Sequence, residues 1–200
     1  MDKIIALNCP GCNQPTSSDQ KQCKFCKRPI VIQHTDIPSM TMPELAKYMQ
    51  AYRSVSLANP EHKSINASLA LCYMKMKLYD KALEVLNKIM NDNVDNPDIF
   101  FYVAVCCLKD KKPFLHQRSE IDMMIDNLGA ANSIEMRPIH YLLLSYIRKD
   151  YFDRKFLKTS PSWEDELVMA IAMGATQSTA DELSTFLGLT LPEEIMSQLQ

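Results

Sequence analysis

Two pairs of cysteines near the N-terminus are the residues with the clearest chemistry. Cys9 and Cys12 form one CxxC pair, and Cys23 and Cys26 form a second, with ten residues between the pairs. Two residues between cysteines allow both thiolates to bind one ion, and four thiolates in a tetrahedral arrangement suit Zn²⁺. The ten-residue spacer has room for one hairpin, so both pairs can reach the same ion. The sequence therefore predicts one structural Zn²⁺ with a closed ligand shell that leaves no position for catalysis.

The first pair resembles the CPxCG knuckle of zinc ribbons, since it reads Cys9-Pro-Gly-Cys12. Asn13 and Lys27 stand where such knuckles usually carry glycine. Asn tolerates a positive φ, whereas Lys27 puts the geometry of the second turn in question. A redox CxxC is the rival interpretation, but it needs a βαβ context that the sequence does not predict. The resemblance implies a zinc ribbon over residues 1–33.

A ribbon of this size buries too little surface to fold without its metal. We expect short strands at Ile4–Leu7 and Ile30–Ile32, on either side of the knuckles. We also expect the ribbon to have a core separate from that of the helices, with residues 34–42 as a linker.

The rest of the chain has a helical composition. Its 200 residues include only 4 Gly beside 13 Met, and 46% are hydrophobic. The net charge of −2 excludes a global attraction to nucleic acid or to an anionic membrane, and no apolar run of 18 residues predicts a spanning helix. Seven cysteines, an odd number, do not suggest a secreted disulfide framework. Paired knuckles with free thiols fit a reducing compartment, so we expect a cytoplasmic protein.

Helix starts recur along the chain. Thr41–Glu44 is a capping-box pattern that predicts a helix to about Ala58. Asn59-Pro60 and Asn96-Pro97 each predict a helix with Asn as N-cap and Pro at the first position, and Pro138 marks a similar juncture. The intervals of 37 and 41 residues between these prolines indicate stacked helix pairs.

Residues 63–96 resemble a tetratricopeptide repeat. The resemblance depends on two kinds of residue. Ala70 and Ala82 are small and stand where two helices approach closely, and aromatic and apolar residues fill the space between the helices: Leu69, Tyr73, Tyr79 and Leu86. Asn66 and Ile89 depart from the family pattern, and two further units, from Pro97 and from Pro138, are degenerate. The resemblance implies a tetratricopeptide-like α-solenoid of paired helices over residues 43–158, following the ribbon in a mostly α protein.

Residues 159–200 differ in composition, because they contain seven acids and no Lys or Arg. We expect three helices in this acidic C-terminal segment, starting near Ser160-Pro161, Ser178 and Thr190, with Gly188 ending the middle one.

Two surfaces are candidates for partner binding. The repeat positions that face a peptide carry no carboxylate clamp, but their apolar side chains predict a groove for an amphipathic helix. That groove consists of Ala67, Leu71, Met74, Phe101 and Val105. The alternative is that the chain's own helices fill it.

The second surface is the segment 146–158, which combines five cations with four aromatic rings. Its candidate contacts are Arg148, Lys149, Arg154 and Lys155. These cations could bind an acidic partner or RNA, or be solvated beside core-facing rings, or pack against the acidic segment 159–200.

No catalytic constellation and no phosphate-binding loop occurs in the sequence, so we predict a non-enzyme without a small-molecule substrate. The predicted function is a protein–protein interaction adaptor or assembly factor whose partner the sequence does not identify. The alternative is a nucleic-acid-associated factor that uses the ribbon and residues 146–158. We predict no membrane association.

Overall fold

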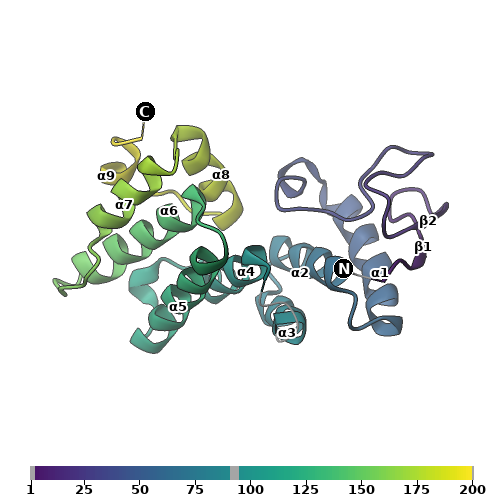
Figure 1. Ribbon diagram of the computed structural model, residues 1–200, viewed down its shortest axis with the longest axis horizontal. Helices are drawn as coiled ribbons and strands as arrows, with labels where there is room; N and C mark the ends of the chain where they lie inside the picture. The colour runs from purple at the N-terminus through teal and green to yellow at the C-terminus, as the bar shows by residue number, and fades with distance from the viewer. Residues whose placement is uncertain (1–2, 91–94, 200) are drawn as a thin grey trace. The chain divides into compact units, whose positions relative to one another are not determined.

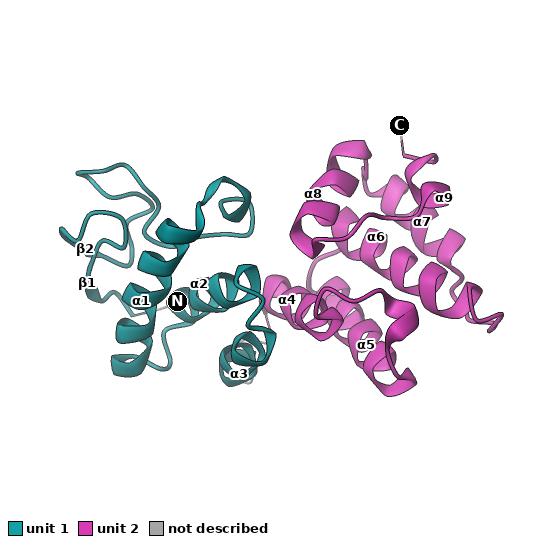
Figure 2. Cartoon of the chain, turned by 180° about the vertical axis from the view of Figure 1, so that it is seen from behind, with its two compact units in different colours: residues 1–94 teal, residues 95–200 magenta. Residues whose placement is uncertain are grey.

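The computed structural model describes residues 3–90 and 95–199 (Figure 1). The chain divides into two compact units, residues 1–94 and residues 95–200 (Figure 2). This division falls inside the predicted repeat region, so the four segments 1–33, 34–42, 43–158 and 159–200 remain a prediction. Within the described ranges, no helix is both long and apolar enough to cross a membrane.

Unit 1 begins with a small hairpin and continues as helices. Strand β1 (Ala6–Asn8) pairs antiparallel with β2 (Pro15–Ser17). The short 3-10 helix η1 (Ile37–Ser39) follows, inside the segment expected to be a linker, and buries Ile37. The helices are α1 (Met42–Ala58), α2 (Lys63–Lys75) and α3 (Tyr79–Met90). Helix α2 packs against both α1 and α3, which gives the paired arrangement that the sequence predicts.

The capping box at the start of α1 is confirmed: Glu44 accepts from the backbone N–H and the hydroxyl of Thr41. The prediction that Asn59 begins the next helix is wrong. The N–H of Asn59 donates to the carbonyl of Val55, so Asn59 ends α1 instead. Helix α2 starts after His62, whose ring accepts from the N–H of Ile65.

Unit 2 is helical throughout its described part. Its elements are α4 (Pro97–Leu108), η2 (Pro113–Leu115), α5 (Arg118–Ile134), α6 (Pro138–Ile147), the π-helix η3 (Arg148–Asp153), α7 (Trp163–Ala172), α8 (Gln177–Leu187) and α9 (Glu193–Met196). The helix starts at Asn96-Pro97 and Pro138 are confirmed. Gly188 ends α8 at φ 66, as predicted.

Helix α6 lies at the centre of unit 2. It packs against α5, α7 and α8, and α4 packs against α5. The three C-terminal helices match the expectation for residues 159–200, although α7 begins after its N-cap Ser162, slightly later than Ser160-Pro161. The acidic segment thus belongs to the same compact unit as α4–α6.

Candidate metal centre

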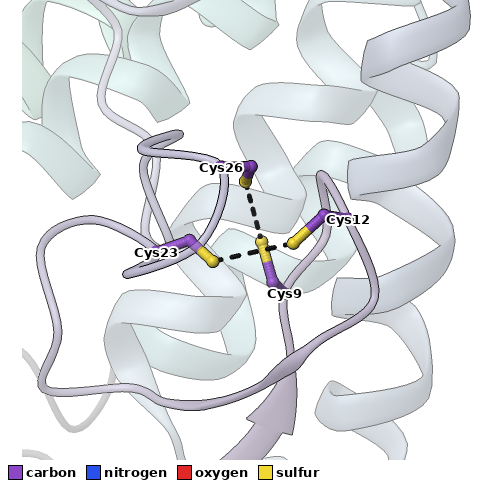
Figure 3. A group of neighbouring side chains, drawn as sticks. All are labelled: Cys9, Cys12, Cys23 and Cys26. Atoms are coloured by element: carbon purple, nitrogen blue, oxygen red, sulfur yellow. Dashed lines mark hydrogen bonds between the residues drawn. The ribbon is translucent and has the colours of Figure 1, made fainter.

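The four N-terminal cysteines converge on one point (Figure 3). Their Sγ atoms all lie within 4.8 Å of one another. The Sγ atoms of Cys9 and Cys26 are 3.6 Å apart, as are those of Cys12 and Cys23. A Zn–S bond of about 2.3 Å in a tetrahedral site places neighbouring sulfurs about 3.8 Å apart, close to these separations. The four thiols therefore fit one tetrahedral metal ion, and an all-thiolate set favours Zn²⁺.

The two knuckles share one backbone design. In the first, the N–H of Asn13 donates to the carbonyl of Cys9 at 2.8 Å; in the second, the N–H of Lys27 donates to the carbonyl of Cys23 at 2.9 Å. Asn13 and Lys27 both have a φ of 62°. Lys27 thus adopts the left-handed conformation that glycine usually supplies, and the second turn keeps the geometry of the first.

Gly11 lies close to the second knuckle. A Cβ atom at this position would lie 2.8 Å from the Cδ atom of Arg28 and 3.4 Å from the Sγ atom of Cys26. A side chain at this position would therefore move the side chain of Arg28, so glycine lets the two knuckles approach without that shift.

The thiols differ in acidity in the metal-free protein. Burial raises the pKa of Cys9 to about 12, whereas hydrogen bonding from the backbone of Cys26 lowers the pKa of Cys23 to about 6. The two thiols thus shift in opposite directions, and their titrations are linked through the neighbouring sulfurs. Because a metal binds thiolates, ion binding would release the proton of Cys9.

The segment that follows the second knuckle, residues 29–32, is hydrogen-bonded to the helices of unit 1. Three helical hydroxyls donate to consecutive parts of this segment: Tyr48 to the carbonyl of Pro29 (2.9 Å), Tyr52 to that of Ile30 (2.7 Å) and Ser68 to that of Ile32 (3.1 Å). The side chains of Ile30 and Ile32 are buried. The ribbon segment and helices α1 and α2 therefore share one core, and the expectation of separate cores is wrong.

The same contacts explain an error in the strand prediction. Ile30–Ile32 is not a strand, because its carbonyls accept from side-chain hydroxyls in place of a neighbouring strand. A single antiparallel bridge, between Gln22 and Pro29, precedes it. The first strand exists but lies at Ala6–Asn8, slightly after the predicted Ile4–Leu7.

An ion pair adds to this docking. Arg28, from the second knuckle, pairs with Glu44 in the first turn of α1 at 2.6 Å. The pKa of Glu44 is lowered, first by the backbone N–H of Thr41 and further by the hydroxyl of Thr41 and the charge of Arg28. The carboxylate thus caps α1 and contacts the ribbon at once.

Residues 46–100 match the family model of the tetratricopeptide repeat. This region is similar to tetratricopeptide repeats. The match includes α2 and α3, the helices of the repeat predicted from the sequence, together with most of α1. A search of curated proteins finds no match, and neither does a search of solved structures.

The predicted apolar groove remains a prediction. Ala67, Leu71 and Met74 belong to α2 in unit 1, and Phe101 and Val105 belong to α4 in unit 2. All except the half-buried Ala67 are buried. The ring of Phe101 stacks on Phe186 of α8, with centroids 5.9 Å apart. Helix α8 therefore covers the ring of Phe101. At this position the structure agrees with the alternative that the chain's own helices fill the groove.

The cations of segment 146–158 fall into two groups. Arg148 is buried and pairs with the buried Glu166 at 2.9 Å, while Lys149 pairs with Asp153 at 2.8 Å and lies 3.6 Å from a carboxylate oxygen of Glu194. These contacts match the third alternative, in which the basic segment packs against the acidic one.

Arg154 and Lys155 form the second group, and both lie over aromatic rings. The guanidinium of Arg154 is 4.4 Å from the ring centre of Phe114, and the Nζ atom of Lys155 is 3.7 Å from that of Tyr151. Arg154 also pairs with Asp150 at 3.1 Å. Arg154 is exposed and Lys155 is half-buried, so a partner could reach both, Arg154 more readily.

The docking hydroxyls are the functional residues that sequence reasoning missed. Tyr48 and Tyr52 are four residues apart and so share one helix face with Leu45, a pattern that predicts burial. Nothing in the sequence pairs them with Pro29 and Ile30.

Proposed function

We propose that this protein is a non-enzymatic adaptor or assembly factor that binds another protein through its helical units. The observation that carries this proposal is the tetratricopeptide-repeat-like region at residues 46–100, since repeats of this kind generally bind proteins. Fold similarity alone is a weak argument for function, so the proposal also draws on the chemistry of the cysteine cluster.

The metal centre supports a structural role for the ribbon. Four cysteines complete a tetrahedral shell, so a bound Zn²⁺ would hold the knuckles together and have no free position for a substrate. The contacts from Tyr52 and Ser68 tie this ribbon to α1 and α2. The ion would thus stabilise the start of the repeat-like region, and four reduced thiols suit the cytoplasm.

A nucleic-acid-associated function is the second candidate. With Zn²⁺ and four thiolates, residues 1–33 carry a charge of about +1, which is weak for phosphate binding. Arg148 and Lys149 pair with Glu166 and Glu194, which lowers the charge available to a phosphate backbone. The internal pairing therefore favours the protein-binding proposal.

Affinity capture with the full-length chain separates the two candidates. The bait is incubated with native lysate, with and without nuclease, and the bound proteins are quantified by mass spectrometry. A stoichiometric protein partner that survives nuclease supports the adaptor, and its binding should also survive moderate salt. Recovery that collapses on nuclease treatment contradicts the adaptor and supports the nucleic-acid candidate.

A further inference from the structure

The turn between η3 and α7 combines features that the fold of unit 2 does not explain. In Figures 1 and 2, the chain that joins α6 to α7 turns back at the end of unit 2. Phe156, within this turn, is 94% exposed, and the adjacent Leu157 is 45% exposed. Two neighbouring apolar side chains thus face solvent where burial would stabilise them.

The backbone of Phe156 is also unusual, with a φ of 57°. This left-handed conformation disfavours a bulky side chain and is most often supplied by glycine at the end of a helix. Two hydrogen bonds hold the turn, from the N–H of Phe156 to the carbonyl of Asp153 (2.9 Å) and from the N–H of Leu157 to that of Phe152 (2.8 Å). Glycine would therefore suit position 156 better than phenylalanine, because the φ is positive and the side chain is exposed to solvent.

Cations flank Phe156 in the sequence, although Arg154 also pairs with Asp150 at 3.1 Å and Asp153 precedes this segment. Residues 154–158 contain Arg154, Lys155 and Lys158 and no acid. The heads of Arg154 and Lys155 rest over rings at their base, Phe114 and Tyr151, which fixes both cations beside the turn. An exposed aromatic side chain with Lys155 and Lys158 beside it in the sequence resembles the hot spots of protein interfaces, in which one buried aromatic side chain supplies much of the affinity.

Building on the proposed adaptor function, we propose that residues 154–158 form a docking tip that inserts Phe156 into an apolar pocket of a partner protein with an acidic rim. The charge of the tip selects the acidic rim. A single free ring favours a protein over a single-stranded nucleic acid, because strand binding stacks successive bases on several rings. The neighbouring rings of Tyr151 and Phe152 are buried in unit 2 and do not offer such a platform.

The test uses the full-length chain with benzoylphenylalanine at position 156, and at position 57 as a control. Leu57 is an exposed apolar residue of unit 1, so it reports non-specific capture. After irradiation in native lysate, the cross-linked segment is mapped by mass spectrometry, and the partner is then purified. We expect a cross-link from position 156 alone, to a segment rich in Asp and Glu around apolar residues.

Phe156→Gly then separates docking from folding. Because glycine suits the positive φ, the melting temperature should stay the same or rise, whereas affinity for the purified partner should fall at least about tenfold. If Phe156 only stabilised the fold, the substitution would lower the melting temperature and the affinity together. Lys158→Glu should weaken binding and reduce its dependence on salt, and Leu57→Ala should leave binding unchanged.

Three outcomes overturn the docking tip: no cross-link above that of position 57, a cross-link to nucleic acid or lipid, or partner affinity that Phe156→Gly does not change. If the nuclease-resistant partner is still captured by Phe156→Gly, the adaptor function stands and the tip is not its contact. If no nuclease-resistant partner is captured by the unmodified chain, the adaptor proposal itself fails.

Discussion

Replacing Tyr52 by phenylalanine tests whether the ribbon and the helices of unit 1 share one core. The substitution removes only the hydroxyl that donates to the carbonyl of Ile30 at 2.7 Å, inside a fully buried contact. Leaving a buried carbonyl without a partner costs about 1–3 kcal/mol. The opening equilibrium of unit 1 should therefore rise by roughly 5- to 150-fold at 25 °C.

Hydrogen exchange followed by mass spectrometry measures this change in the zinc-loaded, full-length chain. We expect amides of the second knuckle and of α2 to lose protection together, while α5 in unit 2 keeps its protection and serves as an internal reference. Tyr48→Phe provides a graded comparison, because its contact to Pro29 is only partly buried and water can replace the lost donor. Tyr141→Phe, at a half-buried position of α6, is the control for the chemical change.

The result that refutes this reasoning is a loss of protection confined to the ribbon, with α2 unchanged. It would mean that the ribbon opens independently and that the hydroxyl contacts do not join the two parts. An effect of Tyr141→Phe on unit 1 would equally contradict the assignment.

Three further predictions concern the metal, a buried ion pair and pH. Elemental analysis should find one zinc per chain, and Cys9→Ser should abolish it and lower the protection of α1; full zinc content in that variant would contradict the four-cysteine site. Glu166→Gln should destabilise unit 2 by about 3–5 kcal/mol in urea unfolding, because it leaves the buried charge of Arg148 without its counter-ion; an unchanged midpoint would show that the pair contributes nothing. The pKa of Glu44 is lowered in the folded chain, so this carboxylate stabilises the fold above its unfolded pKa, and the stabilisation is lost as pH falls through the folded pKa. Glu44→Gln should therefore make the free energy of unfolding depend less on pH in the acid range. The same pH dependence in Glu44→Gln and in the unmodified chain would contradict this prediction.

The parts of the fold that the sequence predicts well depend on local geometry. The CxxC spacing determines how two thiols meet one ion, and the four Sγ atoms cluster as expected. Capping patterns at Thr41 and Asn96 act within one helical turn, and both begin helices where predicted. The repeat-like region is likewise visible, because small residues stand where its two helices face each other: Ala70 of α2 and Ala82 of α3 are both fully buried.

Two predictions of local structure are wrong, one at Asn59 and one at Ile30–Ile32. Asn59 carries the sequence features of an N-cap, yet its N–H completes the preceding helix. Ile30–Ile32 has the composition of a strand, but hydroxyls from two later helices satisfy its carbonyls. For segment 146–158, the alternative that it packs against the acidic residues 159–200 agrees with the pairs of Arg148 with Glu166 and of Lys149 with Glu194. The contacts of Ile30 and Ile32 join residues 22 and 36 positions apart, which no single-sequence pattern reveals. The Asn59 error is local, because its contact with Val55 lies within one helical turn.

The docking of the second knuckle on α1 and α2 has a consequence for synthesis of the chain on the ribosome. Cys26 is translated 42 residues before Ser68, the last of the three hydroxyl donors. At a translation rate of about 5–20 residues per second, the completed set of four thiols waits roughly 2–8 s for the helix surface that covers its neighbouring segment. A metal ion bound to the four thiols during that interval would stabilise the nascent ribbon before the last of its helical contacts can form.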